Sequence, residues 1–169
     1  MQKKTWFVVF ISLLVVAGVV GATRLVQQSK LSCLDALVQG QVETSISMLD
    51  AIADRQASGE ITMDEAQDLG AALLRNLSYG DEGYFWADTT EGVNVVLYGR
   101  SDVEGRNRLE DTDVKGNYFV KSFISTGLSG GGFVDYWFVK INETDEQAKR
   151  SYVQYFEPFD WVIGSGYYH

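Results

Sequence analysis

The sequence has little of the chemistry that most catalytic and metal sites use. It contains one cysteine, Cys33, and one histidine, His169, in 169 residues. A single cysteine excludes an intramolecular disulfide, and these two residues supply too few ligands for a zinc or iron–sulfur centre. The histidine is the last residue of the sequence, which excludes Ser-His-Asp and Cys-His arrangements. We therefore predict that the chain is not an enzyme and that it holds no metal or cofactor.

Basic residues are also scarce. Lys and Arg together number 14 against 23 Asp and Glu, so the formal net charge is −9. Recognition of nucleic acid needs a basic face that neutralises phosphates, and such a balance excludes it. An anionic ligand would have to be held by a few local cations against an unfavourable overall field.

The first 22 residues differ from the rest of the chain. Residues 6–22 form an uninterrupted apolar run, preceded by Lys3 and Lys4. A helix of this length spans about 25 Å, slightly less than the hydrocarbon core of about 30 Å. The leading lysines predict a single-pass anchor in the cell inner membrane, with the globular domain periplasmic or extracellular. The small residues Val20, Gly21 and Ala22 leave removal as a signal peptide open.

Helical periodicity follows the apolar run. Residues 23–61 are predicted to form one long membrane-proximal helix that ends before Gly59, a residue suited to a left-handed cap. A second helix begins at Thr62, where Glu65 completes a capping box. Both helices are expected to pack on a sheet, and the first also to form a homodimer. The apolar positions of the long helix recur in steps of three and four: Leu31, Leu34, Val38, Val42, Ile46, Leu49 and Ala53.

The rest of the chain, residues 62–169, is predicted to be one α+β domain. Its strands are bounded by turn residues and separated by a polar loop over 99–116 and a short helix over 117–126. Five or six antiparallel strands packed on the N-terminal helices form the expected sheet. The predicted strands cover residues 84–88, 93–98, 133–140, 149–156 and 161–168.

Five segments in this order resemble a known family. They are Gly83–Trp86, Asp113–Asn117, Gly131–Trp137, Lys149–Val153 and Phe156–Tyr167. The region 24–168 is similar to a single Cache domain of the second type, the PAS-like extracytoplasmic sensor module of bacterial chemoreceptors and sensor kinases.

The resemblance implies a PAS-like sheet that binds a small molecule on one face, often a short carboxylate such as acetate, propionate, lactate or pyruvate. The long helix would pass the signal to a partner. Two features depart from the family. Tyr98-Gly99 stands where His-Pro is common, and family receptors continue past the position of His169 into a second membrane helix and a signalling domain. Output is therefore expected from a separate signalling chain, or the sequence is part of a longer receptor. The alternative is a structural subunit of a membrane or surface assembly that kept the fold without a ligand.

A carboxylate site needs one cation and a few hydroxyl or N–H donors in an apolar cup. Lys149, which matches a family lysine, and Arg100 are the candidate cations, whereas Arg106 and Arg108 are expected on the surface. Strand alternation places Arg150 and Tyr152 on one face, or alternatively Lys149 and Ser151. Trp161 and Trp137 are predicted to belong to the core. The predicted ligand-binding residues are Trp86, Tyr98, Arg100, Tyr136, Phe138, Lys149 and Tyr152.

Overall fold

The computed structural model describes the backbone of residues 2–169 and the side chains of residues 26–169. Contacts divide the chain into two compact units, residues 1–36 and residues 37–169. The predicted membrane anchor at residues 6–22 lies outside the described side chains. Within the part of the chain that is described, no helix is long and apolar enough to cross a bilayer.

Helix α1 covers Gln2–Ala57. In the second unit, one stripe of this helix is buried, formed by Val38, Val42, Leu49 and Ala53, as its periodicity predicts. The helix ends where Gly59 takes a left-handed conformation, with φ of 77°. The N–H group of this glycine donates a hydrogen bond to the carbonyl of Gln56, in the last turn of the helix, at 2.9 Å. The predicted end of the long helix is thus confirmed.

Helix α2, Met63–Asn76, begins with the predicted capping box. The Thr62 hydroxyl accepts a hydrogen bond from the Glu65 N–H at 3.2 Å, and the Glu65 carboxylate accepts one from the Thr62 N–H at 2.8 Å. The two bonds satisfy donors that a bare helix end would leave unpaired. Ala66 and Leu74 form the buried face of α2.

Six antiparallel strands form the sheet, in the order β1-β2-β6-β5-β4, with β3 paired to β2. The fold is α+β, as predicted, with one short strand, β1, that the sequence did not indicate. Strand β5 also begins earlier than expected, because the β4–β5 ladder extends to the pair Val139–Glu146. The strands are β1 Ser78–Tyr79, β2 Gly83–Thr89, β3 Asn94–Leu97, β4 Gly132–Val139, β5 Glu146–Phe156 and β6 Trp161–Tyr168, with a 3-10 turn, η1, at Glu157–Phe159.

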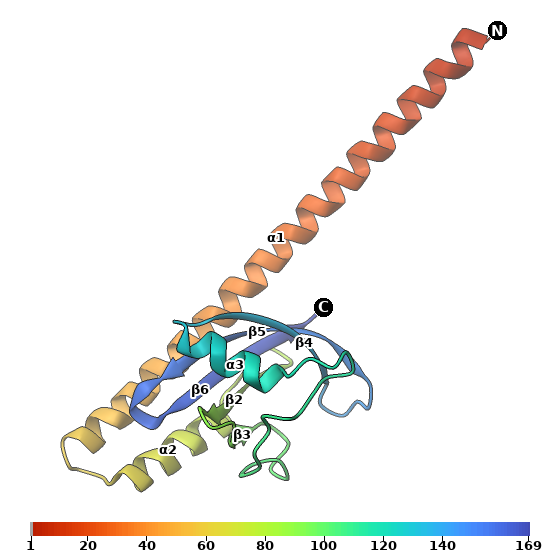
Figure 1. Cartoon of the computed structure of the whole chain (residues 1–169). Helices are drawn as coiled ribbons and strands as arrows, with labels where there is room; N and C mark the ends of the chain where they lie inside the picture. The colour runs from red at the N-terminus through yellow and green to blue at the C-terminus, as the bar shows by residue number, and fades with distance from the viewer. Residues whose placement is uncertain (1) are drawn as a thin grey trace. The chain divides into compact units, whose positions relative to one another are not determined.

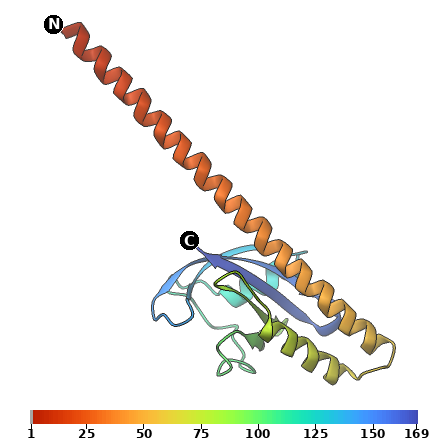
Figure 2. The same ribbon diagram turned by 180° about the vertical axis from the view of Figure 1, so that it is seen from behind.

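The two faces of the sheet carry different cores. Helix α3, Phe119–Leu128, lies against one face, while α2 and the last turns of α1 cover the other (Figures 1 and 2). The core on the side of α1 and α2 is called the helix-side core. It consists mainly of the buried residues of these two helices together with Phe85, Ala87, Val96, Tyr152, Phe156, Phe159, Trp161 and Ile163. The α3-side core is built of Tyr84, Trp86, Leu97, Val103, Phe119, Val120, Phe123, Ile124, Val134, Tyr136, Val153 and Val162.

The polar loop between β3 and α3 is hydrogen-bonded to β4 through the carboxylate of Asp113. Asp113 accepts hydrogen bonds from the backbone N–H groups of Lys115 and Asn117, each at 2.9 Å, and from that of Trp137 at 3.0 Å. Burial acts against the charged form of Asp113, but a hydrogen bond from the Asn117 side chain at 3.0 Å and these backbone bonds outweigh it and lower the pKa of the carboxyl group. Asp113 therefore connects the loop, which also carries Arg108, to the sheet.

Candidate ligand-binding site

The pairing of β4 with β5 positions the cation of the site. Tyr136 lies opposite Lys149, and Val134 lies opposite Ser151. Because side chains alternate along a strand, all four point to the α3 side of the sheet. The hydroxyl groups of Tyr136 and Ser151 are 3.1 Å apart. Lys149 consequently enters the α3-side core and is only 1% exposed.

Lys149 is surrounded by aromatic rings. Its ammonium group donates a hydrogen bond to the Tyr84 hydroxyl at 2.6 Å. The nitrogen lies 4.1 Å from the centre of the Tyr84 ring, 4.8 Å from Tyr168 and 5.1 Å from Trp86, within cation–π range. No carboxylate among residues 26–169 pairs with it, and burial lowers the pKa of Lys149 to about 7.

A small inner cavity lies beside Lys149. Its volume is about 10 Å³, close to the space that one water molecule occupies. The indole N–H of Trp86 is buried on its wall and has no hydrogen-bond partner among the described residues. Lys149 and the ring of Trp86, whose N–H group is unused, therefore line the same space. The inner cavity is lined by Tyr84, Trp86, Leu97, Arg108, Phe119, Phe123, Tyr136, Phe138 and Lys149.

Arg108 contributes a second buried cation. It is 3% exposed, and its guanidinium lies 3.5 Å from the carboxylate of Asp88 and 3.3 Å from that of Asp111. Asn94 also donates to Asp88, at 2.8 Å. Burial raises the pKa of Asp88 to about 6, although Arg108 and Asn94 both favour its charged form. In contrast to Lys149, this arginine has carboxylate partners.

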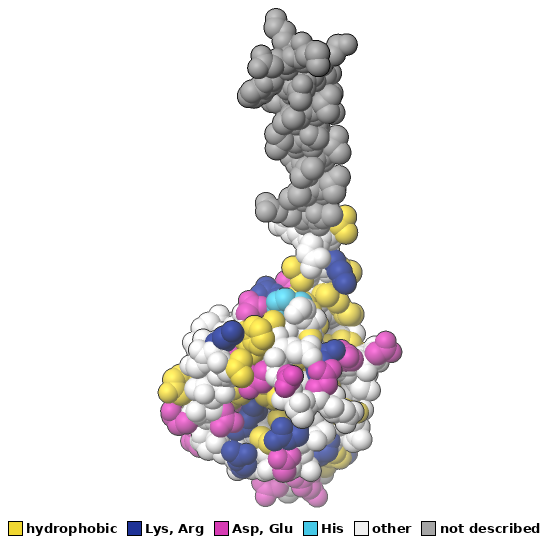
Figure 3. Space-filling model, turned by 90° about the vertical axis from the view of Figure 1, so that its right-hand side faces the viewer, with side chains coloured by type: hydrophobic (Ala, Val, Ile, Leu, Met, Phe, Trp, Pro, Cys, Tyr) yellow, Lys and Arg dark blue, Asp and Glu magenta, His cyan; other side chains and the backbone are white. Residues whose placement is uncertain are grey.

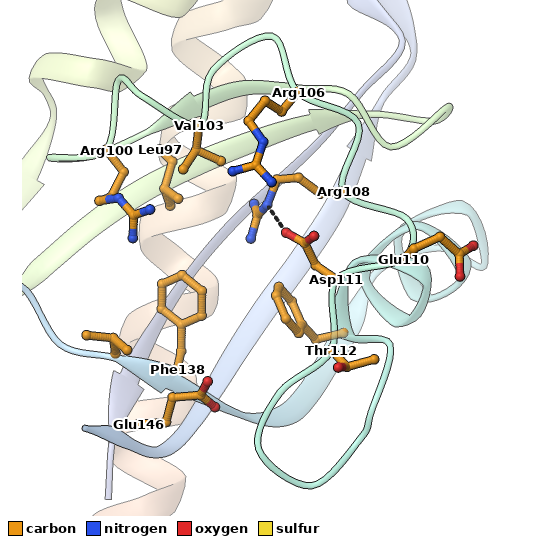
Figure 4. A pocket seen from close by; sticks show the side chains of 12 residues that line it. Leu97, Arg100, Val103, Arg106, Arg108, Glu110, Asp111, Thr112, Phe138 and Glu146 are labelled. Atoms are coloured by element: carbon orange, nitrogen blue, oxygen red, sulfur yellow. Dashed lines mark hydrogen bonds and ion pairs between the residues drawn. The ribbon is translucent and has the colours of Figure 1, made fainter. Parts of the chain in front are cut away.

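A larger cavity, the vestibule, lies outside the inner cavity and has a volume of about 420 Å³. Figure 4 shows its arginines along one side and Phe138 with Glu146 on the other. Three basic and three acidic side chains line it, so it has no strong field of one sign. The side of the molecule in Figure 3 likewise shows basic and acidic groups interspersed. The charged lining residues are Arg100, Arg106, Arg108, Glu110, Asp111 and Glu146.

Comparison with known proteins places this arrangement in a family. The sequence model of the family Single Cache domain 2 matches residues 34–169. The chain belongs to this family. A periplasmic sensor domain of a chemotaxis protein is 32% identical to this Cache domain, with a TM-score of 0.79 over 82% of this chain and 96% of that one. A structure described as the basis for carboxylic acid recognition by a Cache chemosensory domain is 25% identical, also with a TM-score of 0.79, over 83% of this chain and 97% of that one.

Two relatives are a sensor histidine kinase and a methyl-accepting chemotaxis protein. The sensor histidine kinase MctS of Rhizobium johnstonii is 30% identical over 84% of this chain. The methyl-accepting chemotaxis protein McpP of Pseudomonas putida is 25% identical over 99% of this chain. The chain spans only 30% and 31% of the lengths of these two proteins. The resemblance to a single Cache domain is confirmed, and the domain is of the sensor type found in chemoreceptors and histidine kinases.

Four of the predicted site residues meet in the Cache domain. Trp86, Tyr136, Phe138 and Lys149 all line the inner cavity. Strand β4 pairs directly with β5, whereas β2, which carries Trp86, is joined to β5 only through β6. Trp86 fits closely on β6, since a Cβ atom at Gly164 would lie 2.4 Å from its ring.

Tyr98 and Arg100 lie farther out. Tyr98 is 36% exposed and stacks on Tyr84 with ring centroids 5.8 Å apart. Arg100 lines the vestibule but is exposed and paired with Asp102 at 3.0 Å. Strict alternation along β3 would place Asn94 and Val96 on one face of the sheet, but the pairing of β2 with β3 shifts register at Ala87/Asp88. The shift leaves Val96 in the helix-side core and turns Leu97 to the inner cavity.

Tyr152 lies on the opposite side of the sheet from the inner cavity. It belongs to the helix-side core and makes an edge contact with Phe133, with ring centroids 5.1 Å apart. Of the two alternatives for the face of β5, the structure therefore has the one with Lys149 and Ser151. Trp161 is in the core as predicted, whereas Trp137 is half-buried under the ammonium group of Lys115.

Sequence reasoning missed Arg108, Leu97, Phe119 and Phe123 as wall residues. Arg108 was predicted to lie on the surface, and its burial contradicts that prediction. Nothing in the spacing of a polar loop indicates which arginine turns inward. Tyr84 was detectable, because it alternates with Trp86 on the first long strand. Within residues 26–169, no group of three or more side chains could hold a metal ion.

Proposed function

We propose that this Cache domain is an extracytoplasmic sensor that binds a short carboxylate against Lys149 and signals through α1 to a partner. The observation that carries the proposal is a fully buried lysine without a carboxylate partner, in a cavity that it shares with Trp86, whose indole N–H is unused. A buried cation is costly unless an anion pairs with it. A bound carboxylate would supply that anion and accept hydrogen bonds from the indole N–H and from the Tyr84 hydroxyl.

The size of the inner cavity favours a small ligand. At about 10 Å³ the cavity is smaller than any carboxylate, so binding requires wall side chains to shift. A ligand of two or three carbons needs the smallest shift. Structural similarity to a Cache domain that recognises carboxylic acids supports the same class of ligand.

The layers of the domain suggest how binding would be transmitted. Strand β5 carries Lys149 on one face and Tyr152, within the helix-side core, on the other. That core includes Val42 and Leu49 of α1. A shift of β5 on binding would therefore change the packing of α1, whose equilibrium between two positions the ligand would bias.

The relatives suggest the setting of the domain. By analogy with the sensor kinase and the chemotaxis protein, the domain would lie outside the inner membrane and be anchored through residues 6–22. It would act as a homodimer, and the signalling output would lie in the same chain or in a separate one. In this proposal the domain itself performs no reaction.

Thermal unfolding of the purified chain tests the proposal. Acetate, propionate, lactate and pyruvate at millimolar concentration should raise the melting temperature by about 5 °C near saturation. The corresponding amides, which lack the charge, should not. Lys149→Met should abolish the response, whereas Lys115→Met, a matched change on the surface, should preserve it.

A melting temperature that no short carboxylate moves would contradict the carboxylate proposal. If amino acids and amines also had no effect, the alternative of a structural subunit without a ligand would account better for the chain.

A further inference from the structure

Phe138 and Leu97 separate three spaces on the α3 side of the sheet. Both residues line the inner cavity, the vestibule and a third cavity of about 160 Å³ that lies toward Tyr98 and the β4–β5 turn. We call these two side chains the partition. The partition alone lines all three spaces, although Arg108 and Phe119 also lie between the inner cavity and the vestibule, and Tyr84 between the inner cavity and the third cavity.

Three other wall residues of the inner cavity, Trp86, Tyr136 and Phe123, are closely packed. A Cβ atom at Gly164 would lie 2.4 Å from the Trp86 ring, so the indole already fills the groove on β6. Tyr136 is fully buried and is held by Ser151 at 3.1 Å. Phe123 packs against both rings, with centroids 5.3 Å from Trp86 and 4.9 Å from Tyr136.

The partition, by contrast, has open space behind it. Phe138 is only half-buried, and its ring meets Phe119 edge-on, with centroids 5.8 Å apart. The Lys149 nitrogen lies 5.5 Å from the centre of the Phe138 ring. A carboxylate held by Lys149 would therefore point its carbon chain toward Phe138, since open space lies behind that ring on two sides.

We propose that Phe138, together with Leu97, determines the maximum chain length of the ligand. The inference rests on the proposed carboxylate site and adds a residue that sets its specificity. Each methylene group that enters an apolar space strengthens binding about fourfold. With the partition in place, a longer chain clashes with Phe138 instead of gaining this contribution. Without it, the chain extends into the vestibule.

Calorimetric titration of the full chain with acetate, propionate, butyrate, pentanoate and hexanoate tests the inference. For the natural protein we expect affinity to fall at least tenfold between propionate and hexanoate. For Phe138→Ala we expect the order to reverse, with hexanoate bound about tenfold or more tighter than by the natural protein. Phe133→Ala is the matched control, because Phe133 lies on the same strand but faces the helix-side core.

The outcomes separate the inference from the function on which it rests. If the natural protein binds propionate but Phe138→Ala keeps the same length preference, the partition does not set specificity and the carboxylate site stands. A shift of equal size in Phe133→Ala would also overturn the inference. If no carboxylate binds the natural protein, the proposed function fails and this inference with it. If Phe138→Ala does not fold, Phe138→Leu should show a smaller shift in the same direction, and an unchanged preference would count against the partition.

Discussion

The two faces of the sheet show two different uses of burial. On the helix side, Leu49, Phe85 and Ile163 are at most 2% exposed and belong to an apolar core. On the α3 side, Lys149 and Asp88 are buried equally deeply. The same sheet therefore supports an ordinary core on one face and ionisable groups in an apolar environment on the other.

Burial of an apolar side chain stabilises the fold, whereas burial of an ionisable group costs free energy that its partners only partly restore. The pKa values of Lys149 and Asp88 move in the directions that this cost predicts, downward for the lysine and upward for the carboxylic acid. Groups perturbed in this way concentrate at functional sites. The comparison thus indicates that apolar cores on both faces stabilise the fold, and that the α3 side also holds the candidate site.

The largest effect should come from the helix side. Leu49 is fully buried between α1 and the sheet, and Leu49→Ala should lower the free energy of unfolding by about 3 kcal/mol. Chemical denaturation measures this loss. Ligand affinity of the folded fraction should stay within about threefold, and a much larger loss of affinity would show that the two faces are not separable.

Lys149→Met should have the opposite effect on stability. Methionine fills a similar volume without a charge to bury, so the ligand-free variant should be at least as stable as the natural protein at pH 6. The same denaturation experiment, run beside Lys115→Met, gives the comparison. A marked loss of stability would mean that the Tyr84 hydrogen bond and ring contacts outweigh the burial cost.

The dependence of stability on pH should separate the two ionisable groups. Between pH 7 and 10.5 the unfolded chain holds a proton on Lys149 that the folded chain has released, so this group makes stability rise with pH. Between pH 4 and 6 the folded chain holds a proton on Asp88 that the unfolded chain has released, so stability falls with pH. Together they predict the least favourable contribution near pH 6 to 7.

Unfolding curves measured from pH 4 to 9 test this dependence. Lys149→Met should flatten the rise above pH 7, and Asp88→Asn the fall below pH 6. The neighbouring Tyr84 and Tyr136 do not titrate in this range, because burial raises their pKa values further above 10. If the slope above pH 7 persisted in Lys149→Met, another group would be responsible for it.

Most of the fold could be predicted because its signals are local. The capping box at Thr62, the end of α1 before Gly59 and the alternation along β2 each depend on residues within one turn or strand. The same is true of the alternation that groups Tyr136 with Phe138. The family resemblance added the prediction that the sheet is PAS-like and that Lys149 is a candidate cation of the site.

The rest of the site depends on contacts that spacing does not encode. Arg108 is buried because its loop packs against the sheet, where Asp113 accepts a hydrogen bond from β4. This position brings Arg108 to Asp88, which is 20 residues earlier in the chain. The face of Leu97 depends on a register shift in the pairing of β2 with β3. Alternation alone did not show which side chains of β5 point to the α3 side of the sheet. The pairing of β5 with β4 places Lys149 on that side and Tyr152 on the other.

Asp113→Asn should moderately lower both the stability of the fold and its affinity for the ligand. The asparagine keeps the shape but replaces one acceptor oxygen by a donor that faces backbone N–H groups, so about 1 to 3 kcal/mol of stability should be lost. Ligand affinity should fall too, because the loop positions Arg108. Calorimetry at a temperature where the variant stays folded separates the two losses. Unchanged affinity would show that the position of Arg108 does not depend on this anchor.

The smallest effect should come from Arg100, the predicted cation that the structure places at the rim. Its exposed ion pair with Asp102 is screened by water, so Arg100→Ala should change stability by less than about 0.5 kcal/mol. Carboxylate affinity should stay within about threefold, and any loss should shrink as salt is raised. The same titrations with Lys149→Met provide the contrast. An Arg100 variant that lost binding as completely as the Lys149 variant would move the site from the inner cavity to the vestibule.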